Sequence, residues 1–121
     1  MKICITSQGD NFTAEVDPRF GRAFYFLFVD TDNMKSEAIQ NPYMQAGGGA
    51  GIQAAQFVAN KDIEAVITGN IGPNAFQVLK EAGLSIISGV SGNVKAAIEK
   101  YKKGELKSAE NPTVKEKFGM T

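Results

Sequence analysis

Three glycine-rich stretches, each followed by a helical pattern, constrain this chain more than any other feature. They are 47–51 (GGGAG), 68–74 (TGNIGPN) and 88–93 (SGVSGN). Glycine clustered in this way lets the backbone turn tightly and lets another molecule approach it closely. A glycine loop that opens a helix also points unpaired backbone N–H groups at whatever lies above it. Each stretch is therefore a candidate anion site, and for each one taken alone the alternative is a simple tight connection.

The remaining apolar segments predict five strands. Residues 2–6, 63–68 and 84–88 are short apolar runs that are typical of buried strands. The aromatic-rich run 23–29 predicts a strand buried on both faces, and a polar turn joins it to a weaker strand at 34–40. The strands at 23–29 and 34–40 form a hairpin. The second is a polar edge strand, which discourages pairing with the sheet edge of another molecule.

Helical spacing follows each glycine stretch. The first helix covers 52–59, and the second runs from Pro73, where proline is tolerated, to Gly83. Ser91 is the expected N-cap of a third helix that ends at Gly104. The order β-β-β-α-β-α-β-α predicts a three-layer α/β fold, with a five-stranded mixed sheet and three helices. Ligands bind beyond the carboxyl ends of such parallel strands, so we expect the glycine loops to gather there.

A long loop at 10–22 precedes the hairpin and ends in an arginine-rich motif. The motif reads Arg19-Phe20-Gly21-Arg22 and places two guanidinium groups beside an aromatic ring. Such an arrangement suits recognition of an anion or of a cofactor that carries carboxylates. The alternative is an ordinary exposed loop in which Phe20 folds back onto the core, and the sequence leaves both interpretations open.

Composition narrows the class of protein. The 121 residues are 43% hydrophobic and 21% charged, which indicates one globular domain spanning 1–121. Lys+Arg and Asp+Glu are 13 each, and this balance argues against a nucleic-acid-binding protein. No apolar run approaches the ~20 residues of a membrane span. A single cysteine and the lack of a signal-peptide pattern predict a cytoplasmic location.

Taken together, the motifs resemble the dinitrogenase iron–molybdenum cofactor biosynthesis family, as a stand-alone domain like NifX or the C-terminal part of NifB. This resemblance implies a ribonuclease H-like motif with strand order 3-2-1-4-5. It also implies transient binding of an iron–sulfur or iron–molybdenum cofactor precursor, with cofactor-assembly proteins as partners. The matching stretches span nearly the whole chain in the family's order, at 5–7, 18–23, 47–51, 68–75 and 89–94.

The chain departs from the family in having no histidine. Arg19 stands where other members often have a histidine before Phe-Gly, and Lys117 stands before a second such pair, Phe118-Gly119. A protein-held iron–sulfur cluster takes about four thiolates or histidines, whereas Cys4 lies mid-strand, where we expect a buried, inert thiol. We therefore predict no permanently bound cofactor, and no stoichiometric iron, zinc or molybdenum in protein purified in air.

Three candidate functions follow from these features. The first is a non-catalytic carrier for an anionic iron–sulfur or iron–molybdenum cofactor precursor, or a related metallocluster. The second is a small-molecule or phosphate-binding module on the same loops, which the sequence does not separate from the first. A ribonuclease H-like nuclease is disfavoured because the first strand lacks a carboxylate for a two-metal site, and Asp10, Asp17 and Asp30 lie outside the motif loops.

The predicted site combines the arginine motif with the three glycine stretches. We predict no catalytic residues, since no histidine is available for a triad, and no metal ligands. Both arginine side chains are expected to be exposed at the mouth of the loops, so that their loss weakens binding and leaves thermal stability nearly unchanged. The predicted binding residues are Arg19, Phe20, Gly21, Arg22, Gly47, Gly48, Gly49, Gly69, Asn70, Gly72, Asn74, Ser91, Gly92 and Asn93.

Overall fold

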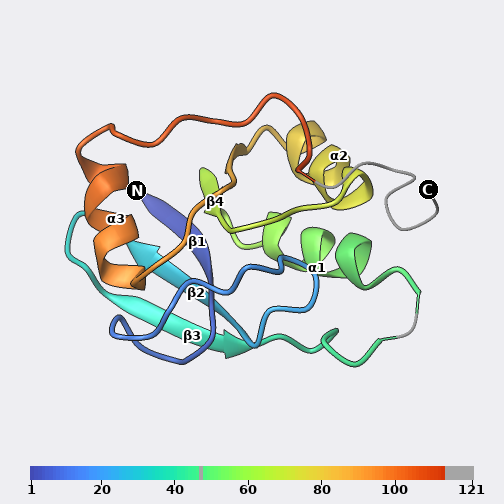
Figure 1. The fold of residues 1–121 in the computed structure, drawn as a ribbon, viewed down its shortest axis with the longest axis horizontal. Coiled ribbons are helices and arrows are strands. Elements are labelled where there is room, and N and C mark those ends of the chain that lie inside the picture. The colour runs from blue at the N-terminus through green and yellow to red at the C-terminus, as the bar shows by residue number, and fades with distance from the viewer. Residues whose placement is uncertain (47, 114–121) are drawn as a thin grey trace.

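The structure, a computed structural model, describes residues 1–46 and 48–113. It contains the predicted sequence of elements, β-β-β-α-β-α-β-α (Figure 1). Gly47 and the second Phe-Gly pair at 118–119 lie outside the described residues. The elements are β1 (Lys2–Ser7), β2 (Tyr25–Asp30), β3 (Ser36–Gln40), α1 (Ala50–Ala59), β4 (Ala65–Ile67), α2 (Pro73–Glu81), β5 (Ser85–Ile87) and α3 (Val94–Lys102).

The five strands form one mixed sheet in the order β3-β2-β1-β4-β5, which confirms the predicted order 3-2-1-4-5. β2 pairs antiparallel with both β1 and β3, whereas β4 pairs parallel with both β1 and β5. β1, β3, β4 and β5 therefore all point the same way. The segments that follow these four strands begin at one end of the sheet, and the predicted site lies among them.

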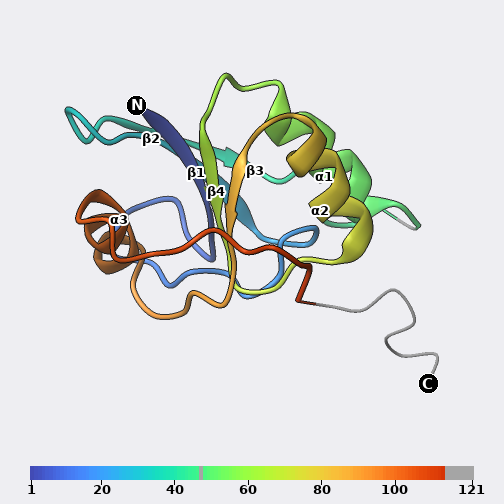
Figure 2. The same cartoon turned by 90° about the horizontal axis from the view of Figure 1, so that it is seen from above.

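The helices cover the sheet from both sides (Figure 2). α1 and α2 pack on one face and α3 on the other, which gives the predicted three layers. β2 shows why both faces are apolar, because its side chains alternate between the two cores. Phe26 and Phe28 pack in the core under α1 and α2, while Leu27 and Val29 pack in the core under α3. The predicted burial of this strand on both faces is confirmed.

Four of the five strands are shorter than the apolar runs that predict them, whereas β1 is one residue longer than the run 2–6. The hairpin strands begin at Tyr25 and Ser36 rather than at 23 and 34, and β4 and β5 have three residues each. The β4–β5 ladder joins three residue pairs, from Ala65–Ser85 to Ile67–Ile87. Ile63 and Leu84, which lie before β4 and β5, pack against the core without belonging to a strand, so hydrophobicity alone overestimates strand length.

The first helix begins inside the glycine stretch. α1 starts at Ala50 rather than at Ile52, and Gly49 precedes it with φ 80. That left-handed conformation is open to glycine at no steric cost. The glycine run therefore supplies both the turn and the first helical residues.

The third helix is capped by a different residue from the one predicted. Asn93 is its N-cap, and the Asn93 side chain accepts a hydrogen bond from the Ala96 N–H group, so the assignment to Ser91 is wrong. The reason is a contact distant in sequence. The backbone bridge between Glu15 and Asn93, and the bond from the Val16 N–H group to the Gly92 carbonyl, hold residues 92–93 against the 10–22 segment, so the helix begins only after Asn93.

The segment after α3 returns along the edge of the sheet to the loop before α2 (Figure 1). The Ala109 N–H group donates to the Ile86 carbonyl in β5. Further on, the Thr113 N–H group donates to the Ile71 carbonyl at 3.1 Å, and the Ile71 N–H group donates to Thr113 Oγ1 at 2.7 Å. This segment covers part of the β5 edge and ties down the second glycine stretch. Among the helices of the described residues, none is long and apolar enough to span a membrane.

Gly69→Ala tests whether the loops pack as closely as the structure indicates. A Cβ atom on Gly69 would lie 2.6 Å from the Pro18 Cα atom, which is part of the backbone and cannot rotate away. We expect a loss of about 1–3 kcal/mol in the free energy of unfolding, because one loop must move. Urea denaturation measures this loss, and Gly48→Ala is the control, since no heavy atom lies within 4 Å of its added Cβ. Equal stability of the two variants would contradict this packing.

Candidate functional site

The 10–22 segment crosses the end of the sheet and is pinned to two strands. Thr6 Oγ1 lies 2.9 Å from the Asp17 carbonyl oxygen and 2.8 Å from the Thr68 hydroxyl. The Asp17 N–H group donates back to the Thr6 carbonyl at 3.0 Å. Thr6, Asp17 and Thr68 are all fully buried. This polar cluster fixes the long loop against the ends of β1 and β4.

The Asp17 carboxylate organises the arginine motif, and the sequence analysis missed it. Asp17 Oδ1 accepts hydrogen bonds from the Arg19 N–H group at 3.0 Å and from Arg19 Nε at 3.4 Å. Asp17 Oδ2 accepts from the Phe24 N–H group at 3.1 Å. The signal in the sequence is the Asp17-Pro18 pair, since aspartate often bonds to backbone N–H groups two residues ahead in turns. Asp17 is thus a structural part of the site.

Glycines bring three separate segments into backbone contact. The Asn70 N–H group donates to the Pro18 carbonyl at 2.7 Å, and the Phe20 N–H group donates to the Asn70 carbonyl at 3.1 Å. A Cβ on Gly21 would lie 2.9 Å from the Gly51 Cα atom in α1. The arginine motif therefore lies directly against the first and second glycine stretches, as the sequence predicts for one end of the sheet.

Phe20 folds back onto the core. Of the two interpretations of the motif, an aromatic ring exposed for ligand recognition or a ring buried in the core, the second holds for this residue. It is 2% exposed, and its ring centroid lies 5.8 Å from that of Phe26. Its ring is part of the core under α1 and α2. Phe20 does not present an exposed aromatic surface. It lines one wall of a hollow between the starts of α1 and α2.

The two arginines have different surroundings. The Arg19 side chain is 53% exposed, its Nε atom faces Asp17, and its guanidinium carbon lies 5.5 Å from the centroid of the Phe24 ring. Its terminal nitrogens make no hydrogen bond within the described part of the chain. Arg19 is therefore held at one edge of its guanidinium group, and the other edge faces outward with donors for a bidentate anion contact.

Arg22 holds the connection between β3 and α1. Its Nη1 atom donates to the Met44 carbonyl at 2.9 Å and to the Ala46 carbonyl at 3.0 Å. Nearby, Asn41 Nδ2 donates to the Gly21 carbonyl at 3.0 Å. Arg22 is exposed, as predicted, and these bonds give it a structural role in addition; its part in anion binding stays a prediction.

A hollow of about 220 Å³ lies between the beginnings of α1 and α2. Neither helix has a side chain that caps its N-terminus, in contrast to α3. Two sets of backbone N–H groups and two positive helix-dipole ends therefore border the same hollow, which favours an anion there. The hollow is lined by Phe20, Gly21, Gly49, Gly51, Ile52, Gly72, Pro73, Asn74 and Ala75.

The structure divides the predicted site into two parts. Phe20, Gly21, Gly49, Gly72 and Asn74 line the hollow. The third glycine stretch lies instead at the start of α3, on the other face of the sheet (Figure 2), where it binds the 10–22 segment. Its three predicted residues, Ser91, Gly92 and Asn93, do not line the hollow.

The second glycine stretch and Gly48 complete the predicted set. Gly69 and Asn70 contribute backbone contacts to the 18–20 segment, as described above, and Asn70 has an exposed side chain. Gly48 is exposed at the loop before α1. These three residues therefore lie near the arginine motif or α1 without lining the hollow itself.

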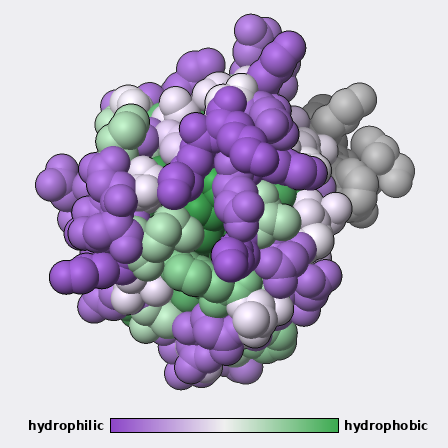
Figure 3. All heavy atoms as spheres, turned by 90° about the vertical axis from the view of Figure 1, so that its left-hand side faces the viewer, coloured by the Kyte–Doolittle hydropathy of each residue, from purple (hydrophilic) through white to green (hydrophobic). Residues whose placement is uncertain are grey.

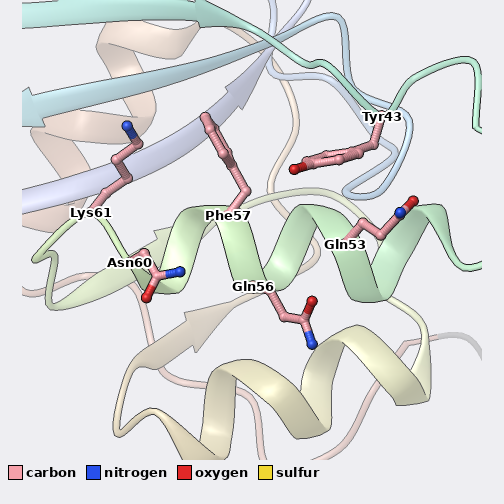
Figure 4. A pocket seen from close by; sticks show the side chains of 6 residues that line it. All are labelled: Tyr43, Gln53, Gln56, Phe57, Asn60 and Lys61. Carbon is pink, nitrogen blue, oxygen red and sulfur yellow. The ribbon is translucent and has the colours of Figure 1, made fainter.

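A larger hollow of about 420 Å³ over α1 lacks convergent polar groups (Figure 4). Gln56 and Asn60 point toward α2, whereas Tyr43 and Phe57 lie on the side of the sheet. The Lys61 ammonium group packs 4.8 Å from the centroid of the Phe57 ring. Because these side chains diverge, the smaller hollow beside the arginine motif is the better candidate site.

Metal-ligating side chains do not gather in the part of the chain that the structure describes. No group of three or more His, Cys, Asp or Glu residues there is placed to hold a metal ion. Cys4 is fully buried among apolar side chains, and this burial raises the pKa of its thiol far above the ordinary value. A thiolate at this position is therefore strongly disfavoured.

Residues 1–104 match the protein family described as dinitrogenase iron-molybdenum cofactor. The chain belongs to this family. The resemblance seen in the motifs is thereby confirmed. The chain is also 30% identical over 113 residues to an uncharacterised protein of Methanocaldococcus jannaschii, in an alignment that covers 91% of this chain and 92% of that protein.

Two solved structures share both the fold and a substantial part of the sequence. The apo form of the orange protein from Desulfovibrio gigas superposes with a TM-score of 0.89 at 36% identity, over 93% of this chain and 95% of that one. A candidate NifB protein from Thermotoga superposes with a TM-score of 0.76 at 34% identity, over 88% of this chain and 91% of that one.

Arg22→Ala should loosen the connection before α1. We expect a decrease of about 1 kcal/mol in the free energy of unfolding, because two hydrogen bonds from an exposed charged group are lost. Lys107→Ala is the control and should change stability less, since that exposed side chain forms no hydrogen bond or ion pair with another described residue. Urea denaturation of both variants measures the difference, and an equal loss for Lys107→Ala would contradict the structural role of Arg22.

The Cys4 thiol should resist alkylation while the protein is folded. Burial keeps the group protonated and out of reach, and the thiolate is the nucleophile in this reaction. Treatment with iodoacetamide at pH 8 followed by mass spectrometry should show no adduct without denaturant and one adduct in urea. Rapid labelling of the native protein would show that β1 opens and that the thiol is available to a ligand.

Proposed function

We propose that this protein is a non-catalytic carrier of an anionic iron–sulfur or iron–molybdenum cofactor precursor, or of a related metallocluster. The observation that carries this proposal is the convergence of two uncapped helix N-termini on one hollow. Arg19, next in sequence to Phe20 in the wall of that hollow, has outward-facing guanidinium donors. Membership of the iron–molybdenum cofactor family supports the choice of a metallocluster as the anion.

The cargo would be held by hydrogen bonds and charge rather than by metal–ligand bonds. Backbone N–H groups at the starts of α1 and α2 would donate to sulfides or to an organic acid on a preassembled cluster. Arg19 would pair with the most exposed anionic group through its terminal nitrogens. Binding of this kind is reversible without breaking a metal–thiolate bond, which suits transfer between cofactor-assembly proteins in the cytoplasm.

The composition of the site supports a role without catalysis. The chain has no histidine, and the buried Asp17 carboxylate is occupied by backbone N–H groups and by Arg19. A second candidate function is the binding of a small anion such as phosphate. The observation that favours it is the volume of the hollow, about 220 Å³, which is below the roughly 300–1,000 Å³ of ordinary ligand pockets.

Anaerobic binding experiments test the proposal. The protein is mixed with isolated iron–molybdenum cofactor, separated by gel filtration and analysed for iron and molybdenum. Arg19→Ala should weaken binding roughly ten- to hundredfold, because a charged hydrogen bond contributes about 1.5–3 kcal/mol. Arg19→Lys should recover only part of the affinity, since lysine lacks the bidentate fork.

Lys80→Ala is the matched control, because it removes one exposed positive charge from α2 outside the hollow. Its affinity for the cofactor should equal that of the unmodified protein. If equal amounts of metal elute with the unmodified protein and with the Arg19→Ala variant, the assignment of the site is overturned. Calorimetry with inorganic phosphate separates the two candidate functions, since tight phosphate binding without cofactor binding would favour the second.

A further inference from the structure

A trough of about 390 Å³ lies between α3 and the turn that joins β2 to β3. Figure 3 shows this face of the molecule, where an apolar area is framed by hydrophilic side chains. In the described residues, α3 is the one helix on its face of the sheet, and it packs beside β1, β4 and part of β2. The trough is lined by Met34, Lys95, Glu99, Lys102 and Lys103.

Met34 provides the apolar floor of this trough. It has φ 59, a left-handed conformation that is uncommon for residues other than glycine, asparagine and aspartate. Its N–H group closes the turn by donating to the Asp30 carbonyl at 2.7 Å. The half-buried Met34 side chain packs against the core under α3. An unbranched apolar side chain therefore stands at a turn position where a polar residue or glycine is usual.

The rim of the trough is positively charged. Lys95, Glu99 and Lys102 are spaced i, i+4 and i+7 along one stripe of α3, and Lys103 follows as the C-cap of that helix. None of these side chains forms an ion pair with another described residue. Their aliphatic stems can line apolar surface while the charged heads stay in water. The chain as a whole has a net charge of +0, so this excess of positive charge is local.

We propose that this trough docks an acidic amphipathic helix of a partner protein. Three ammonium groups against one carboxylate complement Asp and Glu side chains on the partner. The floor at Met34 accepts an apolar side chain from the same segment, in the manner of a helix that lies in a groove. Methionine suits this role because its flexible thioether adapts to varied apolar partners.

A protein segment fits this surface better than a membrane does. Helices that lie on membranes bury their own apolar face in the lipid. The apolar residues of α3, Val94, Ala97 and Ile98, are already buried against the sheet. Glu99 also lies between Lys95 and Lys103 on the rim, and a protein segment can present a neutral side chain at that one position, whereas an anionic lipid surface is negative throughout. The binding partner is therefore a discrete acidic segment.

This docking surface lies on the opposite side of the sheet from the hollow beside α1 and α2 (Figure 2). The proposal is independent of the proposed carrier function, because it uses none of the residues around the hollow. A partner bound at α3 would leave the hollow accessible. The same molecule could then hold its cargo and its partner at once.

Nuclear magnetic resonance titration of the full chain tests the proposal. The probe is a synthetic acidic peptide with leucines at i, i+3, i+4 and i+7 and glutamates at the remaining positions. Backbone amide shifts should concentrate at Met34 and over 94–103. Two comparison peptides, one with serines for the leucines and one with lysines for the glutamates, should bind at least about tenfold more weakly, because each lacks one of the two complementary features.

Three variants make the test specific. Lys102→Glu combined with Lys103→Glu should weaken the acidic peptide about tenfold or more. Met34→Asn should also weaken it, and asparagine tolerates the left-handed turn, so the fold is retained. Lys80→Glu on α2, which reverses one exposed lysine on the other face of the sheet, is the control for charge reversal and should bind normally. Circular dichroism melting of each variant verifies folding.

Four outcomes would overturn the proposal. The first is unchanged peptide affinity in both trough variants, and the second is a set of amide shifts that maps to another face. The third is binding to phosphatidylserine vesicles that is lost in the same variants, which would assign the trough to membranes. The fourth is a dimer in analytical ultracentrifugation that the same variants dissociate, which would assign it to a second copy of the chain.

Discussion

The buried carboxylate of Asp17 is the interaction on which the rest of the site depends. A charged group without exposure to water is costly unless its hydrogen-bonding capacity is met. Here two backbone N–H groups and one guanidinium nitrogen meet it. These bonds fix the turn from which Phe20 enters the core and at which Arg19 faces outward. The Thr6 and Thr68 hydroxyls then attach the same turn to the central strands.

The sequence predicted the parts of the fold that arise from local patterns. The aromatic run in β2, Pro73 at the start of α2 and Gly104 after α3 each identify their elements, and the family resemblance supplied the strand order. The N-cap of α3 was mispredicted, because a backbone bridge between Glu15 and Asn93 decides it and no local pattern encodes such a pairing. The role of Asp17 was missed for a similar reason, since its burial follows from how the loop crosses the sheet.

The site was predicted less completely than the fold. The three glycine loops have similar sequences but different structural roles. A glycine can adopt the positive φ of a turn, or it can allow another backbone segment to pack against it. The hollow draws on two of the loops, and the third joins the long loop to α3. Whether these residues bind an anion stays a prediction. Arg19 is the main residue in that prediction, since Arg22 already donates hydrogen bonds to two backbone carbonyls.

The central position of β1 has a consequence for how the chain folds during synthesis. β1 comes first in the chain but lies between β2 and β4, and its Thr6 meets Thr68 across 62 residues. The antiparallel β1–β2–β3 meander involves only neighbouring strands and can form early, while the parallel pairing waits for β4 to emerge. The end of the sheet that carries the hollow is therefore completed late, when most of the chain has left the ribosome. An aberrant chain that stops before β4 would hold a formed hairpin yet lack the hollow between α1 and α2.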